Sequence, residues 1–192
     1  DFSEGNKFIY RKPEYLDSYY GFGKNTYGFE HDKFVLPSTI RGVEVTSYQG
    51  MMSNFYYAGD ENKLPTHFKS SNPAITDMAY MFKGYPTATL NLDFNTSNVT
   101  TMAYMFSGTK ATNLDLSGFN TDKVETMSSM FNGAEATTID ISSFRLADTQ
   151  PDVNWMFKDC TATTVYVRSQ ADIDYLVENA GDTPATINFV IK

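Results

Sequence analysis

The chain has 192 residues, a formal charge of −8, 41% apolar residues and 15% aromatic residues. This composition excludes a disordered chain, and the length suffices for one domain with a substantial core. The 15 basic residues are scattered and outnumbered by 23 acidic ones, which argues against a nucleic-acid partner.

No apolar run approaches the ~18–20 residues of a transmembrane helix, so we expect no membrane insertion by this segment. The first residue is Asp1 rather than Met, which favours a processed or excised segment. The single cysteine, Cys160, allows no internal disulfide and is expected to be a small packed residue. A nucleophilic role would need a nearby histidine, and His31 and His67 stand in unrelated contexts.

The first part of the chain, residues 1–33, is rich in Phe and Tyr. This predicts an aromatic N-terminal cap, with stacking of the same rings on sugars as the alternative. The next segment, "FVLPSTIRGVEVTS" (34–47), predicts two extended segments joined at Gly42.

A Met-Phe pair then recurs at 81–82, 105–106, 130–131 and 156–157, with steps of 24, 25 and 26 residues. A repeat of this length is typical of a stacked architecture. Apolar residues three and six positions before the first residue of each pair, such as Met102 and Val99, would line one face of a helix. Capping residues precede this run and glycines follow it, so each copy predicts a short capped helix of about three turns.

Each helix is followed by a segment with period-two alternation, which predicts a short half-buried strand. The four segments read "TLNLD", "NLDLS", "TIDIS" and "TVYVR". A phenylalanine then returns the chain to the core, and Phe119 is expected at its centre. Because one copy cannot bury its apolar face alone, stacked copies must share the core.

The repeats therefore define a region of about four to five turns over residues 34–168. The remaining residues, 169–192, predict a C-terminal cap. Its helix, "SQADIDYLVENAG", is capped by Ser169 and ends near Gly181, and "ATINFVIK" follows as a closing strand.

The Val-x-x-Met-x-x-Met-Phe phrase, as in "NTSNVTTMAYMFSGTKATNLDLSGFNTDKVETMSSMFNGAEATTIDIS", resembles the BspA-type leucine-rich repeat of bacterial surface proteins and mycoplasma lipoproteins. The resemblance covers roughly residues 34–178. It implies an α/β fold, a right-handed leucine-rich-repeat-like solenoid. Short parallel strands would form one face and short helices the other, between irregular end caps.

The outward strand positions give the candidate ligand-binding residues. Equivalent side chains in parallel strands lie about 4.8 Å apart, so they predict a flat polar and acidic ladder. The alternative is a solvated face without a ligand. The candidates are Asn91, Asp93, Asp115, Asp140, Tyr166 and Arg168.

Metal and cofactor sites are not expected. The methionines fall in the repeat columns, where core packing accounts for them better than copper ligation does. Calcium would need six to eight converging oxygens, which a flat row does not offer. No catalytic arrangement stands out, so we expect no enzyme.

The resemblance implies a non-catalytic binding or adhesion module at the bacterial cell surface or secreted. Its partner would be a host extracellular protein or a glycan, held on the sheet face. The alternative is a structural spacer or stalk domain with no ligand of its own.

Overall fold

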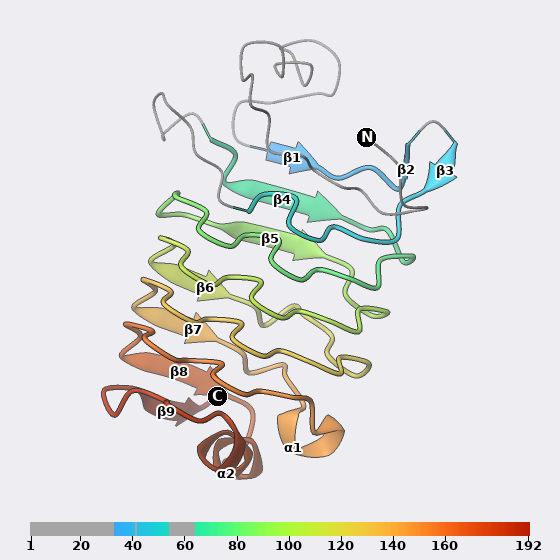
Figure 1. The fold of residues 1–192 in the computed structure, drawn as a ribbon. Helices are drawn as coiled ribbons and strands as arrows, with labels where there is room; N and C mark the ends of the chain where they lie inside the picture. The colour runs from blue at the N-terminus through green and yellow to red at the C-terminus, as the bar shows by residue number, and fades with distance from the viewer. Residues whose placement is uncertain (1–32, 41, 54–63) are drawn as a thin grey trace.

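The computed structural model describes residues 33–40, 42–53 and 64–192, and the fold is a mixed α/β arrangement with parallel sheets (Figure 1). Of the predicted N-terminal cap, all but Lys33 lies outside the described residues. A short antiparallel pair, β2 (Thr39–Ile40) and β3 (Val43–Glu44), flanks Gly42 at φ 80°. The two extended segments expected there are confirmed.

The remaining strands are parallel and follow one another down one side of the molecule (Figure 1). Alternation buries one row of apolar side chains, with Leu114 in register with Ile139 and Ile139 with Val165. One sheet contains β1 (Lys33–Val35), β4 (His67–Ser70) and β5 (Asn91–Phe94). The other contains β6 (Asn113–Asp115), β7 (Thr138–Asp140), β8 (Thr164–Val167) and β9 (Asn188–Ile191).

The division between the two sheets falls between β5 and β6. Phe94 follows Leu90 by four residues, whereas Phe119 follows Leu114 by five. The β6 coil therefore has one residue more than the β5 coil in this stretch, and ahead of the strands Thr112 N still donates to Ala88 O. Hydrogen-bonded strand pairing stops between β5 and β6.

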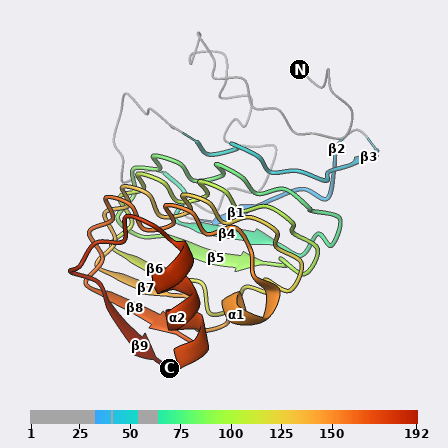
Figure 2. The ribbon, with the colours of Figure 1, turned by 60° about the horizontal axis from the view of Figure 1, so that its bottom comes forward.

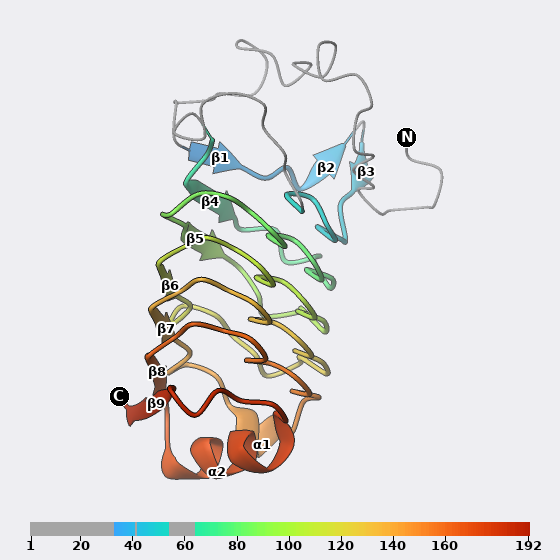
Figure 3. The same ribbon diagram turned by 60° about the vertical axis from the view of Figure 1, so that its left-hand side comes forward.

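The opposite side of each coil is built from turns, so the helix predicted in each repeat is wrong (Figure 3). Three overlapping turns run from Met78 to Tyr85, closed by i→i+3 bonds of 3.0–3.3 Å. Two residues in each repeat adopt the left-handed conformation. In the repeat that contains Met78 they are Tyr80, at φ 60°, and Gly84, at φ 64°. The glycines thus have the positive φ expected of them, but within turns rather than at helix ends.

Alternate N–H groups of each turn segment donate to carbonyls of the next coil, which excludes a helix. From Met78, Tyr80, Phe82 and Gly84 these four bonds measure 2.8–3.0 Å, and the pattern repeats in the next two coils. Coils joined in this way lie about 4.8 Å apart, whereas a helix with its side chains is about 10–12 Å wide. Helices could not stack at that spacing.

The core between strands and turns is a stack of repeated side chains. Phe106 is fully buried, with its ring nearly parallel to Phe82 and Phe131 at centroid distances of 5.7 and 5.9 Å. The Met columns are buried beside it, and Phe119 is 3% exposed, as expected. Shared packing of this kind explains why identical residues recur at each step.

The C-terminal end is closed by two helices and a strand (Figure 2). The helix α2 (Gln170–Asn179) is capped by Ser169, and β9 adds to the edge of β8, so both expected cap elements are confirmed. Tyr175 and Ile173 of α2 pack against the core, and Ala180 O accepts from Trp155 N at 2.7 Å. The short α1 (Leu146–Thr149) was not anticipated from the sequence.

Candidate functional site

The sheet β6–β9 brings three of the six candidate residues into one row. Asp115 of β6 is in register with Asp140 of β7, and Asp140 is in register with Tyr166 of β8. Asp115 is exposed, Tyr166 is half-buried and Asp140 is only 6% exposed. The row is therefore flat but not uniformly open to a ligand.

The two candidates on β5 belong to the other sheet. Asn91 is in register with His67, and its Nδ2 atom lies 3.1 Å from Nε2 of that histidine. Asp93 lies beside Lys69, with Oδ2 and Nζ 2.6 Å apart. These residues form a mixed-charge patch on the sheet that contains β4 and β5.

The two aspartates of the row also shape the chain after each strand. Asp115 Oδ1 accepts hydrogen bonds from the backbone N and the hydroxyl of Ser117, at 3.0 and 2.6 Å. Asp140 Oδ1 accepts from Ser142 N at 2.9 Å. Aspartate at this position closes a local turn, which is a structural reason for the residue apart from any ligand.

Asp140 is held by a lysine from the far end of the sequence. Lys192 Nζ donates to Asp140 Oδ2, and its ammonium lies 5.4 Å from the ring centroid of Tyr166. Burial by itself raises the pKa of Asp140, but the hydrogen bonds from Lys192 and Ser142 outweigh it and bring the pKa below its ordinary value. Asp140 is therefore an ionised, paired carboxylate.

Lys192 was missed at the sequence level although a signal was present. The closing segment "NFVIK" matches "TVYVR" position by position, and Lys192 takes the place of Arg168. The contact with Asp140 joins residues 52 positions apart, which no local pattern specifies.

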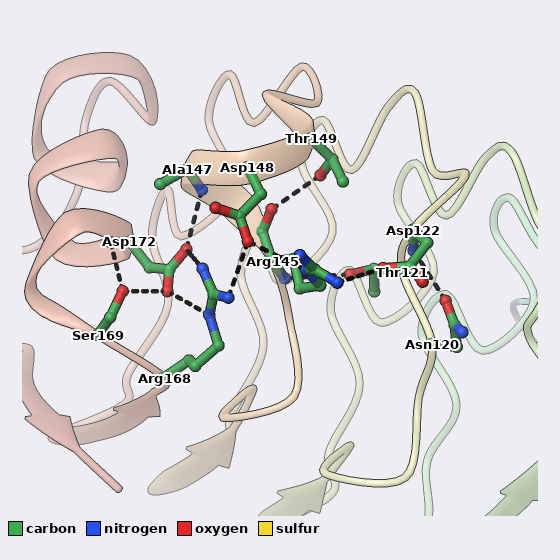
Figure 4. Close-up of polar contacts among 10 residues, drawn as sticks. All are labelled: Asn120, Thr121, Asp122, Arg145, Ala147, Asp148, Thr149, Arg168, Ser169 and Asp172. Atoms are coloured by element: carbon green, nitrogen blue, oxygen red, sulfur yellow. Dashed lines mark hydrogen bonds and ion pairs between the residues drawn. The ribbon is translucent and has the colours of Figure 1, made fainter.

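The sixth candidate, Arg168, faces the C-terminal helices rather than the row (Figure 4). Its Nε atom donates to Asp172 Oδ2 at 3.0 Å and its Nη1 atom to Asp148 Oδ2 at 2.8 Å. Asp172, 1% exposed, also accepts from Ser169 Oγ and from Ala147 N. We call Arg168, Asp148, Ser169 and Asp172 the C-terminal clasp, because they join β8, α1 and α2.

The C-terminal clasp makes stability depend on pH. Burial raises the pKa of Asp172, but the bonds from Arg168, Ala147 and Ser169 prevail and lower it. A carboxyl with a lowered pKa stabilises the fold above its unfolded pKa of about 3.9, and that stability is lost as the pH falls through the folded value. We expect the free energy of unfolding to decrease below about pH 4, measured by denaturant titration.

The matched variant for this prediction is Asp172→Asn, which keeps the shape but not the charge. It should be less stable near neutral pH and show a shallower loss between pH 5 and pH 2 than the parent chain. An identical slope in the two proteins would show that Asp172 does not carry the dependence.

Metal and membrane sites have no support in the described part of the chain. Within residues 33–40, 42–53 and 64–192, no group of three or more His, Cys, Asp or Glu is placed to hold a metal ion. No helix among the same residues is long and apolar enough to cross a membrane. Burial raises the pKa of the Cys160 thiol, which disfavours the reactive thiolate.

Comparison with known proteins identifies the family. The family model described as "Mycoplasma protein of unknown function, DUF285" matches residues 46–169, more than half of the chain, and the chain belongs to this family. No curated protein and no solved structure gives a significant match. The matched region contains the repeated turns and the strands β4 to β8.

Proposed function

We propose that the chain is a non-catalytic binding or adhesion module of a bacterial cell-surface or secreted protein. In this proposal it recognises a host protein or a glycan through its sheet face. The scaffold is a right-handed leucine-rich-repeat-like solenoid of the BspA type, with turns in place of the helices.

The repeat geometry supports this scaffold. Parallel bridges join five equivalent residues in consecutive coils, namely Ser47, Asp77, Thr101, Thr126 and Asp152. Connections between parallel strands of one sheet are right-handed in about 98% of cases, which supports the handedness. The family description, which names Mycoplasma, agrees with a bacterial origin.

One observation carries the binding proposal, namely the row formed by Asp115, Asp140 and Tyr166. Two carboxylates and an aromatic ring stand on adjacent strands, and the ammonium of Lys192 already contacts Asp140 and the Tyr166 ring. A lysine or arginine of a protein ligand would compete with Lys192 for these partners, and Asp115 offers a second carboxylate beside them. A basic segment laid across β6 to β8 is the ligand that this arrangement fits best.

The spacer alternative is favoured by a different observation. Most charges of the sheet face are paired within the chain: Asp93 with Lys69, Asp140 with Lys192, and Arg168 with Asp148 and Asp172. A face whose charges are already paired has less to offer a partner. Asp115 makes no ion pair within 4 Å among the described residues, and Lys192, which pairs with Asp140, acts on Asp115 only through space, so Asp115 distinguishes the two functions.

The test uses Asp115→Asn, which removes the charge and keeps the oxygen that accepts from Ser117. The chain would be screened on an array of extracellular-matrix proteins and glycans, and the affinity for each binder measured with both proteins. We expect roughly a tenfold loss with Asp115→Asn for a basic protein ligand, because a charge-assisted contact at the row is removed.

The control is Glu125→Gln, which removes one exposed acidic charge outside the strands. It should leave affinity unchanged, and neither variant should alter the thermal unfolding midpoint by more than a few degrees. Absence of any binder on the array, or equal binding by Asp115→Asn, would favour the spacer.

A further inference from the structure

The turn side of the coils carries a column of aromatic residues in an unusual backbone conformation. Tyr80, Tyr104 and Trp155 have φ of 60°, 57° and 55°, where L side chains are disfavoured. Gly50 occupies the same column at φ 63° and meets the backbone requirement without a side chain. Ser129, in the same column at φ 55°, shares this conformation, so the backbone geometry belongs to every coil and places the aromatic rings in line.

The rings form two groups. Tyr80 and Tyr104 lie beside Lys83, and Trp155 lies beside Lys158. Tyr80 and Tyr104 stack at 4.8 Å with an interplanar angle of 4°, and Lys83 Nζ lies 5.4 Å from both centroids. Trp155, 44% exposed, has Lys158 Nζ at 5.3 Å from its ring. The ring faces hold the ammonium groups in place without neutralising their charge.

The ammonium group of Lys83 remains available to an anion. Among the described residues, no carboxylate lies within ion-pair distance of Lys83, whereas Lys158 pairs with the exposed Asp182 at 3.5 Å. In a chain of net charge −8, Lys83 is thus a cation held against aromatic rings. The site differs in sign from the acidic row on the strands.

Between Tyr104 and Trp155 the column holds Ser129, which is buried, and the residue before it, Ser128, is also small. Tyr104 and Trp155 are two coils apart, which corresponds to about 10 Å. A ligand that contacts both must be flat and extend over more than one ring.

We infer that the turn side of the coils binds an acidic oligosaccharide through Tyr80, Tyr104, Lys83 and Trp155. The apolar face of a sugar ring would stack on the aromatic side chains, and a uronic-acid carboxylate would pair with Lys83. Single-stranded nucleic acid also stacks on aromatic residues, but it is held along its backbone by a continuous basic groove, whereas Lys83 and Lys158 are separate cations on this side of the coils. This site lies across the coils from the strands, so it does not depend on the proposed sheet-face function (Figure 3).

The test titrates the whole chain with an oligogalacturonide and with a neutral cello-oligosaccharide of the same length. Trp155 is the only tryptophan, so its fluorescence reports ligand at this site directly. We expect the oligogalacturonide to change this fluorescence and to bind at least tenfold more tightly than the neutral sugar. Calorimetry gives the affinity independently.

Two variants and one control complete the experiment. Lys83→Gln and Tyr104→Ser, the second using the residue of the next coil, should each weaken binding about tenfold. Lys123→Gln removes a lysine that contacts Asn98 elsewhere and should bind like the parent chain. Circular dichroism would verify that all three remain folded.

Three results would overturn the inference. The first is no binding of the oligogalacturonide by calorimetry and no change in Trp155 fluorescence. The second is binding that survives both Lys83→Gln and Tyr104→Ser. The third is tighter binding of an oligothymidylate than of the oligogalacturonide, which would identify nucleic acid as the ligand.

Discussion

Replacing Phe106 by alanine is expected to lower the free energy of unfolding by roughly 3–5 kcal/mol. Phe106 is fully buried and lies in the middle of the phenylalanine stack, between Phe82 and Phe131. Because coils on both sides are hydrogen-bonded at fixed spacing, they cannot move together to fill the cavity. The measurement is a urea titration followed by circular dichroism.

Two controls interpret this result. Phe106→Leu leaves a smaller cavity and should cost clearly less than Phe106→Ala. Val35→Ala removes apolar atoms from a side chain that is 71% exposed and should change stability by about 0.5 kcal/mol or less. A loss under about 1 kcal/mol for Phe106→Ala would mean that the stack does not hold the coils together.

The second large effect is expected on removal of residues 182–192. This truncation deletes β9, exposes the edge of β8 and removes Phe189, whose ring lies 5.9 Å from Phe157. Asp140 also loses Lys192 and is left as a buried carboxylate with fewer partners. We expect a loss of at least about 3 kcal/mol and a tendency to aggregate, because the open strand edge can pair with other chains.

The matched control is Lys192→Met, which keeps β9 and removes only the ammonium group. It should cost much less than the truncation and leave the chain monomeric in sedimentation analysis. If the truncated chain stays monomeric and unfolds as cooperatively as the parent, β9 is not a cap.

The pattern of buried residues could be predicted because every copy repeats it. Met102, Met105 and Phe106 are all fully buried, and Ser169 caps α2. The same spacing of three and four residues, however, also suits overlapping turns, which bury the same positions. Periodicity in one coil could not distinguish the two, since the decisive bonds run between coils.

The candidate site was predictable only where it depends on strand alternation. The adjacency of Asp115 and Asp140 follows from equal positions in neighbouring repeats, and the register confirms it. That Asn91 belongs to a separate sheet was not indicated by its equivalence to Asp115 in the repeat. The pairing of Arg168 with Asp172 could not be predicted, because it depends on how α2 packs against the last coil.

By itself the sequence determined which Met and Phe positions are buried in the repeats of about 25 residues, because each repeat has the same apolar positions. It also determined that the chain ends in a helix and a strand. Only the tertiary structure decided that the units form turns instead of helices, since hydrogen bonds on both sides require a spacing near 4.8 Å. The contact between Lys192 and Asp140 was likewise decided only by the tertiary structure, because a contact between residues distant in sequence depends on how the coils pack.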